Sequence, residues 1–105
     1  MSDPEDKRFF LNHWRVDVDL MVAVCDAEIL GSVFVEGKYR LDVNKNFYGG
    51  KLVSLTEAIS YLESASIANL VGVNIVKHAV EAGIIHKDAV IYVDGQPHAQ
   101  LIKIL

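Results

Sequence analysis

Cys25 and His98 are the residues of this sequence whose chemistry could support nucleophilic catalysis. Cys25 is the single cysteine, ends an apolar stretch and precedes Asp26. A thiolate becomes a nucleophile when an imidazolium or a helix N-terminus lowers its pKa, so His98 would be the base and Asn69 or Asp26 would orient it. The alternative is a buried, inert thiol and a hairpin histidine that bonds a backbone carbonyl. Both interpretations stay open, and we assign no residue to catalysis.

A glycine-rich aromatic loop within residues 44–51 is the segment that most suggests binding. Its glycines would expose backbone amides, its lysines could meet phosphates, and its aromatic rings could stack on a base or on a partner's side chain. It lacks the Gly-x-x-x-x-Gly-Lys-Ser/Thr pattern of a P-loop. The alternative is a tight turn whose aromatic rings fill the core. The candidate binding residues here and in the later segments are Lys45, Phe47, Tyr48, Gly49, Gly50, Lys51, Asn69, Gly95, Pro97, His98 and Gln100.

The sequence offers no convincing metal site. His78 and Glu81 have the i, i+3 spacing of di-iron bundles, but those bundles need a second such pair and two further glutamates. A cysteine cage for zinc needs more than one cysteine. His13 and His86 have no partner visible in the sequence. We therefore expect no metal and no cofactor.

The elements that must position these residues begin with strands. Residues 8–14 form a possible first strand, and residues 39–43 alternate as a half-exposed strand. Residues 17–25 carry apolar side chains on both faces near their end, which predicts a central strand. Asp26 is then expected to cap a short turn at residues 27–30 that Gly31 closes.

Two helices are predicted in the middle of the chain. Ser54 and Glu57 match a capping box, which begins a helix that runs to about Ser64. A second helix is expected over residues 67–82. Gly83 would be its left-handed C-terminal residue, and Gly72 would cost this helix about 1 kcal/mol relative to alanine.

The tail predicts a β-hairpin around Asp94 and Gly95, a pair that favours a two-residue turn with positive φ. In that register Val93 pairs with Gln96, and Ile91 pairs with His98. Strands, then helices, then strands predict an α+β fold. Its mostly antiparallel sheet combines the N-terminal strands and the C-terminal hairpin, and two main helices pack on one face.

Composition limits the class of protein. The chain has 105 residues, a net charge of −4 and a pI of about 5.4, whereas electrostatic nucleic-acid binders usually have a pI above roughly 9. The longest run without a charged residue, 64–76, is 13 residues, and a membrane helix needs about 20. No secretory signal opens the sequence. We expect a cytoplasmic protein with a disordered leader at residues 1–7 and a single domain at residues 8–105.

Several segments together resemble the archaeal family called domain of unknown function 424, and they spread over nearly the whole chain beyond the leader. The resemblance implies a small archaeal cytoplasmic protein with a compact α+β fold, and it supplies no catalytic roles. The longer N-terminus, Met1 to about Asp6, departs from the family's usual pattern. The matching segments are Val22–Asp26, Leu30–Gly31, Phe47–Gly50, Ile67–Gly72 and Gly95–Gln100.

The distinctive segments favour a binding module over an enzyme, because they consist mainly of glycine, aromatic, amide and apolar residues. We expect the Phe47–Lys51 loop and the Gly95–Gln100 hairpin to form one face that contacts a macromolecule, with RNA or a ribonucleoprotein as the suggested partner. A homodimer that pairs through the exposed hairpin edge is a further alternative. The enzymatic alternative is acyl-transfer or thiol chemistry by Cys25 and His98.

Overall fold

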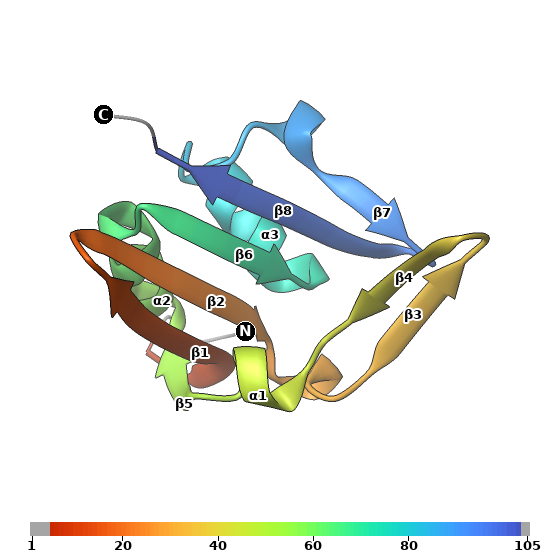
Figure 1. Cartoon of the computed structure of the whole chain (residues 1–105), viewed down its shortest axis with the longest axis horizontal. Helices are drawn as coiled ribbons and strands as arrows, with labels where there is room; N and C mark the ends of the chain where they lie inside the picture. Colours follow the sequence, from red (N-terminus) through yellow and green to blue (C-terminus); the bar gives the residue numbers. More distant parts are fainter. Residues whose placement is uncertain (1–4, 104–105) are drawn as a thin grey trace.

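The structure is a computed structural model that describes residues 5–103, and it confirms the α+β class. Six strands form one sheet in the order β5-β1-β2-β6-β8-β7, and β3 and β4 form a separate two-stranded arm (Figure 1). The sheet strands are β1 Lys7–Val16, β2 Asp19–Asp26, β5 Lys51–Ser54, β6 Ile67–Val71, β7 Ile91–Val93 and β8 Gln96–Ile102. The other elements are β3 Val33–Glu36, β4 Tyr39–Asp42, α1 Lys45–Tyr48, α2 Leu55–Ser64, α3 Val73–Glu81, and the 3-10 turns η1 Ala27–Ile29 and η2 Lys87–Ala89.

Strand β2 lies in the middle of the sheet, as its two apolar faces predict. It pairs antiparallel with β1 and parallel with β6, and the other neighbouring strands of the sheet are antiparallel. Its side chains at even positions enter the core beneath the helices, and those at odd positions point to the opposite face. Of the predicted leader, residues 1–4 lie outside the described range, and Lys7 is the first residue of β1.

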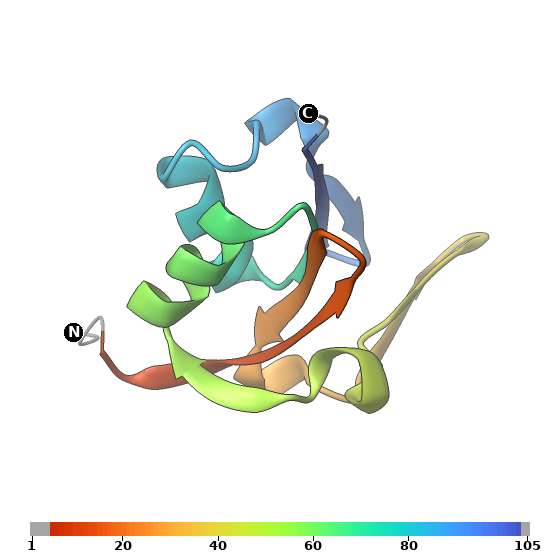
Figure 2. The same cartoon turned by 60° about the vertical axis from the view of Figure 1, so that its left-hand side comes forward.

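Helices α2 and α3 both cover one face of the sheet, and the β3–β4 arm projects from the other side (Figure 2). The predicted capping box of α2 is confirmed, because Ser54 and Glu57 each bond the other's backbone amide. The main core forms between these helices and the sheet, and it includes the fully buried Leu62, Leu70 and Ile75.

The single helix predicted over residues 67–82 is wrong. Residues Ile67–Val71 form β6, and only Val73–Glu81 are helical. Gly72 separates the two elements with φ +124°, a conformation outside the helical region, and its amide donates to the carbonyl of Pro97 at 3.0 Å. The helical spacing was misleading because a short apolar run fits a buried strand equally well. Gly83 has the expected positive φ of +76° after α3.

Asp26 caps a different helix from the one predicted. Its carboxylate makes no side-chain bond to the η1 turn that follows it, but accepts hydrogen bonds from the amides of Asn74 and Ile75 at 2.9 Å. These are first-turn amides of α3, which lack partners within their own helix. Burial raises the pKa of the Asp26 carboxyl, and the two amides oppose that rise. A Cβ at Gly72 would overlap this carboxyl group, so the cap requires glycine there.

The segment predicted as a loop at residues 44–51 contains the one-turn helix α1 and the start of β5. The side chain of Asn44 caps α1 by accepting from the amides of Asn46 and Phe47. Asparagine suits a helix cap as well as a turn, which explains why the sequence pattern pointed to a loop.

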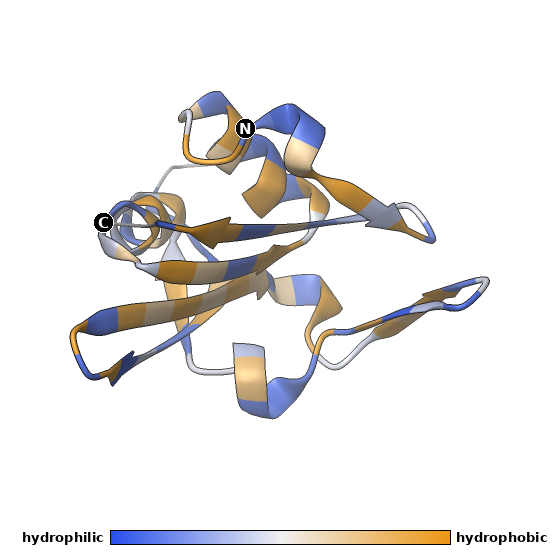
Figure 3. Cartoon of the chain, turned by 45° about the horizontal axis from the view of Figure 1, so that its top comes forward, coloured by the Kyte–Doolittle hydropathy of each residue, from blue (hydrophilic) through white to orange (hydrophobic). Residues whose placement is uncertain are grey.

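The predicted C-terminal hairpin is confirmed in its register. Val93 pairs with Gln96, Tyr92 with Pro97 and Ile91 with His98, and Asp94 and Gly95 both have positive φ. In Figure 3, this hairpin and the β3–β4 arm extend in the same direction from the body of the molecule. The amide of Asp94 donates to the Glu36 carboxylate at 2.7 Å and so joins the two tips.

Candidate functional site

The face of the sheet opposite the helices carries three successive rows of side chains, each with one residue from β1, β2, β6 and β8. We call these three rows the open face; the middle and outer rows include exposed side chains, whereas other elements cover most of the first row. The strand register defines them as Phe10–Cys25–Val71–His98, Asn12–Ala23–Asn69–Gln100 and Trp14–Met21–Ile67–Ile102.

The middle row presents amide groups. The side chain of Gln100 donates to the Asn69 side-chain oxygen at 3.0 Å, and Asn12 donates to the carbonyl of Phe47 at 3.2 Å. Ala23 lies between Asn12 and Asn69 and is fully buried. The row therefore fixes α1 to one side of the face and leaves the exposed Gln100 on the other.

The outer row is apolar. Ile102 is 64% exposed, and Trp14, Met21 and Ile67 are partly exposed. The ring of Trp14 meets Phe47 edge to face, with 5.4 Å between the ring centroids. Such pairs hold aromatic rings in a fixed geometry, so Trp14 and Phe47 form a firm border of the face.

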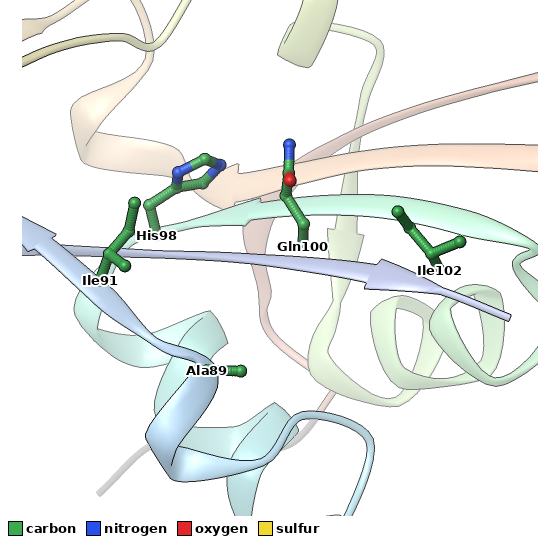
Figure 4. A pocket seen from close by; sticks show the side chains of 5 residues that line it. All are labelled: Ala89, Ile91, His98, Gln100 and Ile102. Carbon is green, nitrogen blue, oxygen red and sulfur yellow. The ribbon is translucent and has the colours of Figure 1, made fainter.

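His98 lies at the opposite border, in a shallow pocket of about 370 Å³ between β7, β8 and η2. Figure 4 shows its ring, Gln100 and Ile102 projecting from the same side of β8, with Ile91 beside them. Partial burial lowers the pKa of His98 below 6.5. Its imidazole is therefore neutral at pH 7 and can both donate and accept a hydrogen bond.

Other elements cover most of the first row, so the Cys25 thiol is not accessible to a substrate. Residues of η1, β4, α1 and β7 pack over this row and leave Cys25 fully buried. Burial raises the pKa of the Cys25 thiol to about 12, and the neighbouring Asp26 adds to the rise. Val71 stands between Cys25 and His98 in the row, which places their Cα atoms about 10 Å apart at the usual strand spacing. The geometry does not support a Cys25/His98 pair.

The predicted binding loop is divided between several environments. Phe47 borders the open face, but Tyr48 is only 4% exposed and belongs to the core. Lys51 points to the helix side, where its ammonium donates to the Tyr61 hydroxyl at 2.9 Å. Lys45 is exposed at the start of α1.

The paired glycines of this loop serve backbone packing. A Cβ at Gly49 would overlap the Lys45 carbonyl, and a Cβ at Gly50 would overlap the Leu11 carbonyl. Gly49 lies against the α1 turn that it ends and Gly50 lies against β1, so close backbone approach explains both glycines without any ligand.

The hairpin residues also separate by face. Asn69, His98 and Gln100 lie on the open face. Pro97 is buried on the helix side, where it lines a groove of about 490 Å³ with residues of α3 and β7, and Gly95 lies at the turn. The structure thus brings together Phe47, Asn69, His98 and Gln100, and not the full predicted set.

Sequence reasoning missed Asn12, Trp14, Met21, Ile67 and Ile102. The first three occupy alternate positions of their strands, a signal that was present but hidden by apolar residues on both faces. Ile67 was missed because its segment was assigned to a helix.

The histidine and glutamate considered as metal ligands form only a surface pair. His78 and Glu81 approach within 3.4 Å on the surface of α3. Within residues 5–103, no three His, Cys, Asp or Glu side chains gather in a way that could hold a metal ion. No helix in the same range is long and apolar enough to cross a membrane.

Comparisons with known proteins agree on family and fold. An uncharacterized conserved protein from Methanopyrus kandleri has a similar crystal structure, with a TM-score of 0.68 and 24% sequence identity over 93% of this chain and 96% of that one. No functionally curated protein matches the chain. The family model described as "Protein of unknown function (DUF424)" matches residues 15–104. The chain therefore belongs to the DUF424 family.

Proposed function

We propose that this protein is a cytoplasmic, non-catalytic module that binds another protein through its open face. The observation that supports this most is the chemistry of the face. All its residues are apolar, aromatic or amide, apart from His98, whose lowered pKa leaves it neutral at pH 7. A buried, free thiol at Cys25 is consistent with a reducing compartment.

The absence of charge on these rows favours a protein over a nucleic acid. Nucleic-acid binding depends on Lys and Arg side chains that neutralise phosphates. The two lysines suggested for that role lie outside the three rows: Lys51 contacts Tyr61 on the helix side, and the side chain of Lys45 lies close to Gly31. The net charge of −4 would also repel a phosphate backbone.

The same face matches the centre of a protein interface. Such centres are depleted of charged residues and enriched in aromatic residues and Met, which Trp14, Phe47 and Met21 supply here. The solvent-facing side of a sheet normally carries polar side chains. Here Ile67 and Ile102 are apolar. Covering the outer row with a partner would remove this apolar surface from water.

The test places one charge on the face and the same charge on the opposite side of the molecule. Ile67→Glu lies in the outer row, and Val73→Glu is a matched control on α3, where Val73 is 53% exposed. Wild type and both variants are immobilised and exposed to a lysate of the source organism with and without RNase. Bound proteins and RNA are quantified, and light scattering gives the mass of each variant.

The expected result is a protein retained by wild type and Val73→Glu, lost by Ile67→Glu and insensitive to RNase. Equal retention by all three would contradict a role for the face. RNA retention that RNase abolishes would identify a nucleic-acid partner instead. A wild-type dimer that Ile67→Glu converts to a monomer would show that a second copy covers the face.

A further inference from the structure

Strand β8 extends beyond its outer neighbour. Strand β7 pairs with β8 only from Gln96 to His98, after which the chain departs through η2. On the other side, β6 pairs with β8 as far as Ile102. The outer edge of β8 from Ala99 to Ile102 therefore has no neighbouring strand among residues 5–103.

The backbone groups at this edge point outward. The carbonyl of Pro97 accepts from the amide of Gly72, and the amide of Lys103 donates to the carbonyl of Ser66 at 2.8 Å. Pro97 and Lys103 therefore direct backbone groups toward the β6 side. Successive residues of a strand direct their N–H and C=O groups to opposite sides. Gln100 and Ile102 consequently present theirs to the side that β7 has left.

The pocket of about 370 Å³ occupies this position, and its lining residues are Ala89, Ile91, His98, Gln100 and Ile102 (Figure 4). Ala89 belongs to η2 and is the lining residue that lies outside β7 and β8. A strand lies about 4.8 Å from its neighbour, so the space next to β8 accepts a single extended segment.

We propose that an extended, uncharged segment of the partner protein adds to the sheet here as a strand beside β8. This inference rests on the proposed function, because the pocket adjoins the open face. The backbone of the added strand bonds Gln100 and Ile102, which is the mode of recognition called β-augmentation. Its side chains on the open face contact Ile91 and Ile102, which are 57% and 64% exposed, and those on the helix side meet Leu101 and Val90.

Hydrogen exchange followed by NMR tests the edge itself. In the isolated protein we expect the amides of Gln100 and Ile102 to exchange on the order of 100-fold faster than those of Ala99 and Leu101, which bond to β6. Equal protection of all four amides would show that the edge is already occupied and would overturn the proposal.

Binding is tested with the capped peptide acetyl-Thr-Val-Thr-Val-Thr-Val-amide. It should protect Gln100 and Ile102 saturably, and the same peptide N-methylated at every residue should bind at least about tenfold more weakly because neither of its edges has an N–H group to donate to β8. Absence of saturable protection by the unmethylated peptide, or equal binding of both peptides, would contradict strand addition. This comparison uses the wild-type protein and does not depend on how any variant folds.

Two substitutions at one position separate this inference from the proposed function. Gln100→Pro removes the outward amide, and Gln100→Ala removes only the side chain that bonds Asn69. Strand addition predicts that partner capture falls much further with proline than with alanine, because only proline removes the backbone N–H group. Capture that survives Gln100→Pro but not Ile67→Glu would leave the open face as the binding surface and refute strand addition. Capture that neither Gln100→Pro nor Ile67→Glu affects would refute both strand addition and binding through the open face.

Discussion

Tyr48 and Lys51 are three positions apart in one segment, yet they contribute differently to the stability of the fold. Tyr48 is 4% exposed and packs in a smaller core with Cys25 and Val71, on the face of the sheet opposite the helices, and Lys51 is an exposed residue of β5. We expect Tyr48→Ala to reduce the free energy of unfolding by about 3 kcal/mol, because it leaves a cavity in the core. Lys51→Ala should leave the melting temperature unchanged. Urea and thermal unfolding of both variants measure this, and a stable Tyr48→Ala protein would place that ring outside the core.

Cys25 offers a direct test of the enzymatic alternative. Because burial raises its pKa to about 12, the thiol stays protonated and enclosed at pH 7. Iodoacetamide should therefore leave the native protein unmodified and alkylate it once urea unfolds the chain. Mass spectrometry distinguishes the two states. Rapid alkylation of the native protein at pH 7 would restore Cys25 as a candidate nucleophile.

His98 makes stability depend on pH. Burial lowers its folded pKa below 6.5, so in mildly acidic solution the unfolded chain binds a proton more readily than the folded one. The contribution of neutral His98 is complete above about pH 6.5 and is lost as the pH falls through the folded pKa. His98→Gln should remove this part of the pH dependence. Urea unfolding from pH 7.5 to pH 5 would show it, and identical slopes for the two proteins would contradict it.

At the scale of elements, the junction between β6 and α3 depends on one glycine and one distant carboxylate. Gly72 has φ +124°, and a Cβ there would overlap the Asp26 carboxyl group that caps α3. We expect Gly72→Ala to cost about 3 kcal/mol, from backbone strain together with loss of the cap. Gly83→Ala is the matched control, because Gly83 has φ +76° but open space around it, and it should cost about 1 kcal/mol. Equal losses in urea unfolding would mean that the carboxylate contact contributes nothing.

At the scale of the whole molecule, the centre of the six-stranded sheet is protected from solvent, whereas the separate β3–β4 arm has only two strands. Strands β2 and β6 have neighbours on both sides and buried side chains such as Val24 and Leu70, whereas β3 and β4 pair only with each other within the described residues. Isolated two-stranded hairpins are marginally stable in water. We expect amides of β2 and β6 to exchange with solvent on the order of 100-fold more slowly than those of the arm, as measured by NMR. Uniform protection would contradict this division.

The sequence alone determined much of the local structure, because local structure depends on neighbouring residues. Ser54 and Glu57 specified the start of α2, Asp94 and Gly95 specified the hairpin and its register, and the two apolar faces of residues 20–25 placed β2 at the centre of the sheet. The α+β class followed from the order of these elements.

Tertiary structure decided whatever depends on neighbours distant in sequence. Ile67–Val71 became a strand because β2 and β8 pair with it on both sides, and Asp26 capped a helix that begins 47 positions later. The open face and the unpaired edge of β8 exist only once strands from both ends of the chain lie side by side. Which side chains become neighbours across a sheet depends on the register between strands that are distant in sequence, and the pattern within each strand does not determine that register.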